Sequence, residues 1–267
     1  MGTAHDRVAQ TEGGKPVIAG VTEPEKSPRG MTSSTSGSAP TLRLSVSAGY
    51  ERWAQTYDDG HNPLLALEQR KIASMLPDLA GKTVLDVACG TGRWFSPLAA
   101  RGLKQLIATD ISRAMLRIAA TKVNCPLALI QADCAAIPLK DGGIDFAICS
   151  FATGHMSNLD RFAKECSRVL RAGAELFISD LHPEAYSAGW RTSFRDHHGS
   201  AEIETIARSG DDVVNTFCSN HFQCIGTYGF CLEESEWPIF VAAGKEKFFA
   251  VASELRAVFV CRFRRMH

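Results

Sequence analysis

The sequence lacks an apolar run of the roughly 20 residues that a membrane-spanning helix needs. No apolar signal-peptide core follows its first residues, so we expect no secretory signal. It also lacks an excess of charge of either sign, because 29 basic residues balance 29 acidic ones. A balanced chain gives no electrostatic reason to bind nucleic acid or another polyanion. These absences predict a protein with no membrane and no nucleic-acid partner.

The nine cysteines form no regular disulfide framework, and their odd number is typical of a reducing compartment. The nearest approach to a metal-binding pattern is Cys218, His221 and Cys224. This spacing is rare among zinc ligands, and no second pair follows it. We therefore predict a cytoplasmic protein without a metal site.

The first 40 residues have scarcely any large apolar side chain and are rich in Gly, Pro, Ser, Thr and Lys. Such a segment cannot bury enough surface to offset the entropy of ordering, so residues 1–40 are predicted to be a disordered tail. Residues 41–267 are predicted to form one domain. Between residues 42 and 59, Tyr50, Trp53 and Tyr57 lie at helical spacing. This aromatic stripe either packs on the core or forms a lid over a ligand.

Strands and helices are predicted to alternate through the middle of the chain. The expected strands cover residues 83–87, 105–109, 127–132, 144–151 and 175–179, with two more at 229–234 and 255–263. Helices are expected after Asn62-Pro63, after Gly92, after Ser112 and after Asn158. This order is typical of an α/β fold with a doubly wound, mostly parallel sheet.

The alternation breaks after residue 180. Residues 202–208 and 213–217 are both β-prone and are joined by Ser-Gly-Asp-Asp, which is typical of a hairpin. We therefore expect residues 183–217 to form an inserted β-hairpin cap after the fifth strand.

The stretch Lys82–Trp94 predicts a ligand site, since a buried strand leads into the small-residue loop 88–92 and then a helix. Such a loop lets a ligand lie against backbone N–H groups at a helix N-terminus. A dinucleotide site needs a third glycine, and Phe95 stands in its place, which excludes a nicotinamide oxidoreductase. Asp86, before the loop, suits an amine-bearing ligand better than a pyrophosphate.

Two more acids close the following strands. Asp110 lies 24 residues after Asp86, where a carboxylate can accept both hydroxyls of a ribose. Asp133 closes the third strand, where a carboxylate can accept the exocyclic amine of adenine. Each acid alone could be a strand-end cap, but three acids that close successive strands are hard to explain by packing. Together they favour an adenosyl ligand with an amine.

These segments resemble the motifs of class I S-adenosylmethionine-dependent methyltransferases. Val84–Gly92 resembles the first motif of that family, and Asp110 lies in a segment similar to the one after its second strand. Residues 132–138, 144–151 and 165–173 resemble later strands and turns. The likeness covers roughly residues 50 to 180. It is strongest to small-molecule enzymes of the ubiquinone/menaquinone-biosynthesis type, and it implies a seven-stranded Rossmann-like sheet.

The resemblance implies S-adenosyl-L-methionine as cofactor and assigns roles by position. Asp86 and the loop would serve the methionine amine and carboxylate, Asp110 the ribose, Asp133 the adenine, and Phe151 the sulfonium side. The full set of expected cofactor-binding residues is Tyr57, Asp86, Ala88, Cys89, Gly90, Gly92, Asp110, Ile111, Asp133, Cys134 and Phe151. Ala88 replaces a frequent glycine of the family, and Ala172 stands where proline is usual.

A sulfonium methyl is already activated, so the protein mainly has to align it with its acceptor. A base is needed only where the acceptor must lose a proton, and histidine is suited to this at neutral pH. His155, four residues beyond the fourth strand, is the candidate; it is either a base or a residue that lines the cofactor site. His182, at the end of the fifth strand, is expected at the same edge. His197, His198 and His221 are expected at the surface.

The predicted function is methyl transfer to a small-molecule acceptor. Tyr57, Trp190 and Phe194 are expected to enclose that acceptor, because such sites exclude water with apolar lids. O- or C-methylation of a quinone, phenol or polyketide-like acceptor is favoured over N-methylation, and a fatty-acyl or acyl-carrier substrate stays open. The alternative is a partner or regulatory subunit that binds the cofactor without turnover. The sequence does not predict an oligomeric state.

Overall fold

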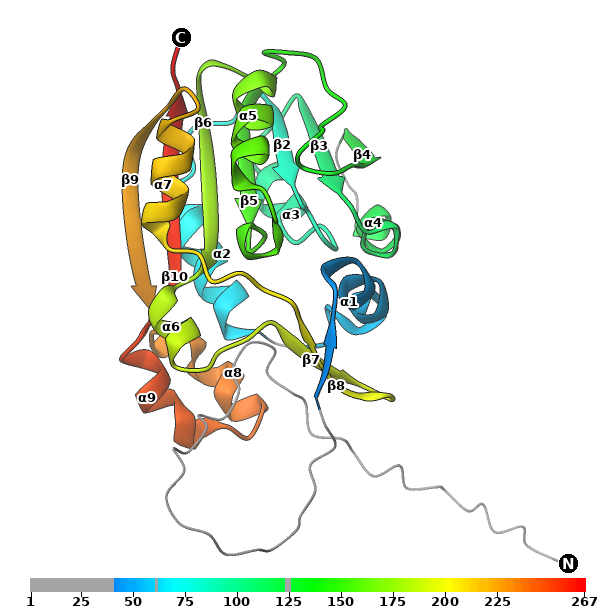
Figure 1. The fold of residues 1–267 in the computed structure, drawn as a ribbon, viewed down its shortest axis with the longest axis vertical. Helices are drawn as coiled ribbons and strands as arrows, with labels where there is room; N and C mark the ends of the chain where they lie inside the picture. The colour runs from blue at the N-terminus through cyan, green and yellow to red at the C-terminus, as the bar shows by residue number, and fades with distance from the viewer. Residues whose placement is uncertain (1–40, 61, 123–125) are drawn as a thin grey trace, which may run out of the picture.

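The computed structural model describes residues 41–60, 62–122 and 126–267. The tail predicted over residues 1–40 lies outside the described residues. A seven-stranded sheet runs through the molecule in the order β4-β3-β2-β5-β6-β10-β9 (Figure 1). Its strands are β2 (Thr83–Val87), β3 (Gln105–Asp110), β4 (Leu127–Gln131), β5 (Ile144–Ser150), β6 (Leu170–Leu181), β9 (Phe222–Cys231) and β10 (Arg256–Arg265). The strands from β4 to β6 are parallel, and β10 is antiparallel to both of its neighbours. The predicted fold class is confirmed.

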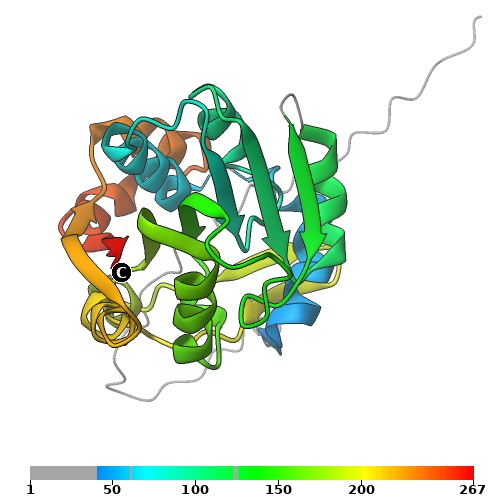
Figure 2. The same cartoon turned by 90° about the horizontal axis from the view of Figure 1, so that it is seen from above.

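The two faces of the sheet bury two separate hydrophobic clusters. Along β5, Phe146 and Ile148 belong to one cluster, and Ala147 and Cys149 belong to the other. This alternation follows from the two-residue period of a strand that is covered on both faces. Helices α2 (Pro63–Met75), α3 (Phe95–Ala99) and α4 (Arg113–Ala119) cover the first face, and α5 (Leu159–Val169) and α7 (Gly210–Cys218) cover the second (Figure 2).

Three of these helices begin where the sequence predicted. The side chains of Asn62, Ser112 and Asn158 each accept a hydrogen bond from a backbone N–H of the first turn. These caps satisfy donors that a helix would otherwise leave unpaired. Helix α3 is shorter than the ten residues expected. The structure also contains the short 3-10 helices η1 (Ala54–Thr56), η2 (Ala120–Lys122), η3 (Thr153–His155), η4 (Glu234–Glu236) and η5 (Glu246–Phe248).

A second, small sheet forms a cap over the carboxyl end of the large one. Strand β1 (Leu42–Leu44) lies parallel to β8 (Gly199–Ile203), which forms a hairpin with β7 (Ser193–Asp196). Helix α1 (Val46–Trp53) follows β1 and lies under the carboxyl ends of β2 and β3 (Figure 1). We call β1, α1, η1, β7 and β8 together the cap.

The predicted hairpin exists, but its residues were predicted wrongly. Residues 213–217 were expected to be a strand, whereas they lie within α7. Ser209 and Asp212 form a capping box that starts this helix, since each side chain binds the other's backbone N–H. Val213 and Phe217, four residues apart, are both buried on one helix face. Their β-propensity was overridden by this packing.

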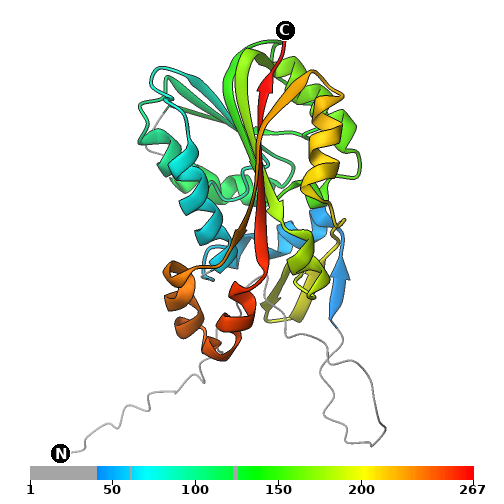
Figure 3. The same ribbon diagram turned by 90° about the vertical axis from the view of Figure 1, so that its left-hand side faces the viewer.

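The last two strands were predicted too short and without the helices between them. Strand β9 begins seven residues before the expected start at Gly229. Helices α8 (Trp237–Ala242) and α9 (Phe249–Ser253) then lie at the end of β9 and β10, near the cap hairpin and α6 (Pro183–Ser187) (Figure 3). In the part of the chain that the structure describes, no helix is long and apolar enough to cross a membrane.

Candidate active site

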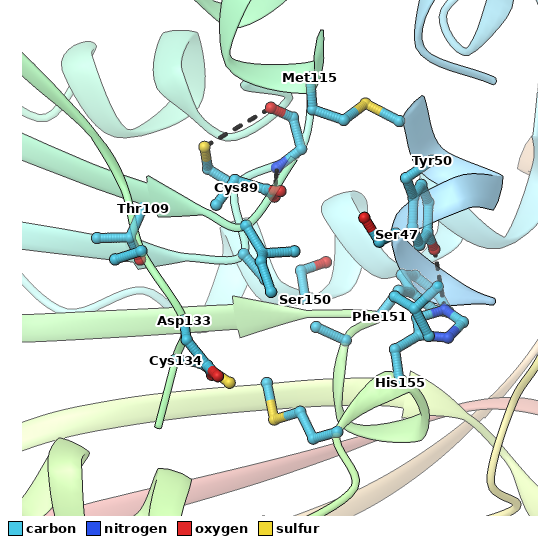
Figure 4. Close-up of a pocket in the computed structure, with 18 of the residues that line it drawn as sticks. Ser47, Tyr50, Cys89, Thr109, Met115, Asp133, Cys134, Ser150, Phe151 and His155 are labelled. Atoms are coloured by element: carbon cyan, nitrogen blue, oxygen red, sulfur yellow. Dashed lines mark hydrogen bonds between the residues drawn. The ribbon is translucent and has the colours of Figure 1, made fainter. Parts of the chain in front are cut away.

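A cavity of about 510 Å³ opens at the carboxyl ends of β2, β3, β4 and β5, and α1 covers it (Figure 4). Open α/β sheets bind their ligands at this edge. The sequence-predicted residues that line the cavity are Tyr57, Asp86, Ala88, Cys89, Gly90, Asp110, Ile111, Asp133, Cys134, Phe151 and His155. The fold therefore gathers residues spread over about 100 positions around one space.

Asp86 lies at the cavity wall with a carboxylate oxygen that has no partner. Its side chain is 1% exposed, and its Oδ2 makes no hydrogen bond within the described residues. Burial raises the pKa of Asp86 to about 8, against the opposing charge of Arg93. A buried carboxylate without a partner is costly, and a cationic ligand group would relieve that cost. Asp86 therefore has the chemistry to hold an ammonium group.

The loop after β2 is held in a left-handed backbone conformation at three positions. Ala88 has φ of 54°, Gly90 of 55° and Gly92 of 81°. A Cβ on Gly90 would meet nothing within 4 Å, so the backbone there is bare toward open space. A Cβ on Gly92 would lie 2.5 Å from the Phe95 ring. Gly92 does not line the cavity; it allows Phe95 to pack against the loop.

Asp110 ties this loop to the start of α4. Its Oδ2 accepts a hydrogen bond from the Gly90 N–H at 2.8 Å, and its Oδ1 accepts one from the Ser112 N–H at 2.8 Å. Burial raises the pKa of Asp110, while these two donors lower it. The carboxylate is thus fixed with lone pairs still free toward the cavity. The next residue, Ile111, leaves 52% of its side chain exposed at the cavity edge.

Asp133 and Cys134 line the end of the cavity beyond β4. The Asp133 Oδ1 accepts a hydrogen bond from the Ala135 N–H at 2.8 Å. Burial raises the pKa of the Cys134 thiol to about 12, with the Asp133 charge as a smaller cause. The thiol is therefore neutral near pH 7. The Asp133 carboxylate lies beside a neutral, apolar surface, and this arrangement suits a nucleobase that carries an exocyclic amine.

A buried ionic network behind Asp86 was missed by the sequence analysis. Glu68, from α2, is 0% exposed, and its Oε1 accepts hydrogen bonds from Ser150 at 2.7 Å and Ser179 at 2.6 Å. The Arg93 guanidinium lies 2.8 Å from Glu68 Oε2 and also lines the cavity. Arg93 directly follows the predicted loop 88–92, so its position could have drawn attention to it. Glu68 could not, because a glutamate in an amphipathic helix is normally a surface residue.

His155 is hydrogen-bonded through both ring nitrogens. Its Nε2 lies 2.9 Å from the Tyr50 hydroxyl oxygen, and its Nδ1 lies 3.1 Å from the Glu204 carbonyl oxygen (Figure 4). Burial lowers the pKa of His155, and the nearby Asp180 charge opposes that shift. The sequence places Tyr50 in an aromatic stripe, but it carries no signal that pairs Tyr50 with His155.

A second cavity of about 50 Å³ lies on the other side of an aromatic wall. Four residues line both cavities, namely Tyr50, Tyr57, Leu65 and Phe151. The side chains of Asp180 and Arg191 line the smaller one. Phe151 itself has φ of 51°, a strained conformation for a bulky residue, and such strain clusters at functional sites.

Trp190 and Phe194, expected to enclose an acceptor, line neither cavity. Trp190 is buried in the hydrophobic cluster that includes α2, and Phe194 stacks on Trp53 with ring centroids 4.9 Å apart. His182 accepts a hydrogen bond from the Glu184 N–H and caps α6. His197 and His198 lie at the turn of the cap hairpin.

Side chains that commonly bind metal ions are not gathered into groups of three or more in the described part of the chain. Within residues 41–60, 62–122 and 126–267, no group of three His, Cys, Asp or Glu side chains is close enough together to hold an ion. Cys218 and Cys224 are free thiols on either side of His221, which has φ of 65°.

Comparison with known proteins agrees with this geometry. Residues 85–178 match the model of a methyltransferase domain family. The chain is 31% identical over 192 residues to a malonyl-[acyl-carrier protein] O-methyltransferase of Dechloromonas aromatica, covering 66% of this chain and 70% of that protein. It is 29% identical over 147 residues to a demethylmenaquinone methyltransferase of Porphyromonas gingivalis. That match covers 52% of this chain and only 59% of the relative.

The chain belongs to the class I S-adenosylmethionine-dependent methyltransferases. A solved S-adenosylmethionine-dependent methyltransferase from Mesorhizobium loti shares its fold, with a TM-score of 0.59 at 17% identity. The superposition covers 76% of this chain and all of that one. The predicted family, enzyme class and cofactor are confirmed.

The residues of this methyltransferase fit its cofactor. The unpaired, buried Asp86 Oδ2 meets the need of an amino group, and the bare backbone at Gly90 leaves room for a close approach. Asp110 holds free lone pairs in a fixed position, as a ribose requires. The cavity of about 510 Å³ lies within the range of small-molecule sites.

Proposed function

We propose that this methyltransferase methylates oxygen or carbon of a small-molecule acceptor, which approaches from the side of the smaller cavity. The observation that carries this proposal is that three aromatic residues, Tyr50, Tyr57 and Phe151, line both cavities together with Leu65. Methyl transfer needs the acceptor atom, the methyl carbon and the sulfur in line and shielded from water. A thin apolar wall between two spaces provides such a meeting point.

We infer the cofactor contacts from the chemistry of each residue. S-adenosylmethionine supplies an activated methyl group on a positively charged sulfur. Asp86 binds the amino group, and the backbone from Ala88 to Gly90 approaches the carboxylate. Asp110 accepts the ribose hydroxyls, while Ile111 covers one face of the adenine. We assign the contact with the adenine edge to Asp133 and Cys134. We assign the contact with the sulfonium to Phe151 and Tyr57.

The relatives support more than one acceptor class. One acts on demethylmenaquinone and another on a malonyl group of an acyl-carrier protein. A ring acceptor has to lose a proton, and His155 then serves as the base. A carboxylate acceptor needs no base. The half-buried His155 at the cavity favours an acceptor with a proton to lose, such as a phenol, a hydroquinone or an acidic carbon. The cytoplasmic location stays a prediction.

The test is calorimetry followed by an acceptor panel. Titration with S-adenosylmethionine should give binding at micromolar concentration. Methyl transfer from labelled cofactor is then measured to a naphthohydroquinone, a catechol, a malonyl thioester and a primary amine. Transfer to one of the first two supports the proposal, and transfer to the amine alone contradicts it. Binding without transfer to any of the four favours a regulatory subunit that retains the cofactor.

A further inference from the structure

The hydrogen bonds of His155 fix which of its nitrogens carries the proton. A carbonyl oxygen only accepts, so the Nδ1 that faces the Glu204 carbonyl at 3.1 Å must be the donor. In the neutral ring, Nε2 then bears a lone pair. The Tyr50 hydroxyl, 2.9 Å from Nε2, must therefore donate to it. Tyr50 keeps its own lone pairs to accept a further proton.

Tyr50 lies where an acceptor would reach it, and its side chain lines both cavities. His155 lines only the larger one of the two. Figure 4 shows Tyr50 extending from α1 and His155 rising from the segment after β5, with their polar ends toward each other. A group that comes from the smaller cavity therefore meets the tyrosine before it meets the histidine.

The surroundings of His155 suit a positive charge that forms during reaction. Asp180 accepts hydrogen bonds from the Thr153 hydroxyl at 2.6 Å and from the Gly154 N–H at 2.8 Å, and so holds η3 in place. Its carboxylate acts to raise the pKa of His155. Arg208 binds the Thr153 carbonyl at 2.9 Å from the outer side. Tyr57 and Asp110 are further titratable groups near Tyr50.

We propose that Tyr50 is the catalytic residue that takes the proton of the acceptor, and that it passes its own proton to His155. The acceptor oxygen or carbon forms its bond to the methyl carbon while the bond between that carbon and sulfur breaks. The proton of the acceptor moves to the Tyr50 oxygen, and the Tyr50 proton moves to His155 Nε2. The products are a methylated acceptor, a neutral thioether, a neutral Tyr50 and an imidazolium at His155. The positive charge of the sulfonium is replaced by that of the imidazolium, so the net charge of the site is unchanged.

This inference rests on the proposed function, and it makes the base a unit assembled from three distant segments. Tyr50 belongs to the cap, His155 to the segment after β5, and the carbonyl of Glu204 to the end of the cap hairpin. The proton path is therefore complete only when the cap is docked.

The test compares Tyr50→Phe, His155→Gln and the double variant. Each single change should lower kcat for a hydroquinone or catechol by about 10²–10⁴-fold, the usual contribution of a general base. Because the two residues act in one path, the double variant should be no slower than the slower single variant. Tyr228→Phe makes the same chemical change on β9, away from both cavities, and should leave kcat unchanged. Cofactor affinity by calorimetry should stay within about threefold in every variant, which excludes a misfolded site.

Nitrogen NMR of the histidine rings gives a readout that does not depend on turnover. His155 should show a protonated Nδ1 and an Nε2 resonance that shifts in Tyr50→Phe but not in Tyr228→Phe. An active wild type whose rate is unaffected by Tyr50→Phe overturns the role of Tyr50 and leaves the proposed function standing. Multiplicative losses in the double variant, or a protonated Nε2, also overturn it. A wild type that binds cofactor and methylates nothing overturns the proposed function itself.

Discussion

The two halves of the large cavity are built in opposite ways. The side that we assign to the cofactor comes from the ends of β2, β3 and β4, where Asp86 and Asp110 lie within their strands and Asp133 follows soon after β4. The side that we assign to the acceptor comes from the cap, where α1 follows β1, a strand that pairs with β8 about 150 residues further along the chain. On the cofactor side, residues that are close together along the chain determine the local structure. On the acceptor side, residues act together only because long-range packing brings them together, so the two halves should fail independently.

The largest expected effect is a loss of stability that is confined to the cap. Phe194 is 4% exposed and stacks on Trp53 within the cap, without lining either cavity. Phe194→Ala should destabilise the cap by about 3–4 kcal/mol, the scale of an aromatic deletion from a core. Hydrogen exchange should rise in residues 42–57 and 193–203 and stay slow in β2 and β5. Uniform exchange across the domain would contradict independent halves, and Phe194→Leu should show a smaller effect of the same pattern.

The complementary change acts on the cofactor half. Asp110→Ala removes a buried carboxylate that fixes both Gly90 and Ser112. The loss should weaken cofactor binding by about 2–3 kcal/mol, the scale of charge-assisted hydrogen bonds. Calorimetry measures it, with exposed Asp160→Asn as control. Cap exchange rates should stay as in the wild type. An unchanged affinity would mean that the ribose lies elsewhere.

The pH dependence of cofactor binding should report on Asp86. Its pKa of about 8 means that it is protonated at pH 6 and must lose that proton to pair with an ammonium group. Binding therefore releases a proton, and affinity should rise by up to about tenfold per pH unit from pH 6 to 8, then level off. Asp86→Asn should abolish this slope. A flat profile in the wild type would contradict the assignment of Asp86 to the amine.

The same group affects the stability of the free protein with a definite sign. The pKa of Asp86 is higher in the folded state than in the unfolded chain, so its contribution is full below pH 4. It is lost as pH rises from 4 toward 8, because the carboxyl group ionises in the unfolded chain while burial keeps it protonated in the folded state. Saturating cofactor should remove this loss, which thermal unfolding at pH 5 and pH 8 can measure.

The smallest effect concerns strain in the cofactor loop. Ala88 has φ of 54°, which costs an L-residue about 1–2 kcal/mol. Ala88→Gly should relieve it and stabilise the domain by about 0.5–1 kcal/mol, after the extra freedom of the unfolded chain is subtracted. Ala80→Gly is the control, since Ala80 is exposed and has no positive φ. A lower melting temperature for Ala88→Gly would show that Ala88 packs usefully.

More of the cofactor side than of the cap could be predicted from the sequence. The positions of Asp86, Asp110 and Asp133 at the cavity could be predicted because a strand end and its neighbours along the chain determine the local geometry, while their roles stay predictions. The cap hairpin was placed about ten residues too late, because β-prone Val213 and Phe217 gave a strand signal that helix packing overrode. Pairing of β1 with β8 leaves no local signal at all.

Contacts between side chains that are far apart along the chain were the hardest features to predict from the sequence. Glu68 is fully buried against Arg93 although its helix position suggested a solvated residue. His155 was found as a candidate, but its link to Tyr50 depends on two segments 105 residues apart. Such pairs arise from tertiary packing, and a single sequence carries no record of it.

The parallel pairing of β1 with β8 has a consequence for the order in which the protein is made. Residues 42–44 leave the ribosome early, but their partner strand, residues 199–203, is synthesised about 150 residues later. Until then the first segment has no sheet to join, while β2 to β6 can already pair with one another. The nascent chain can therefore form the loops after β2, β3 and β4 before the cap can close over them. A chain stalled near residue 190 should expose Trp53 and Tyr50 to chaperones.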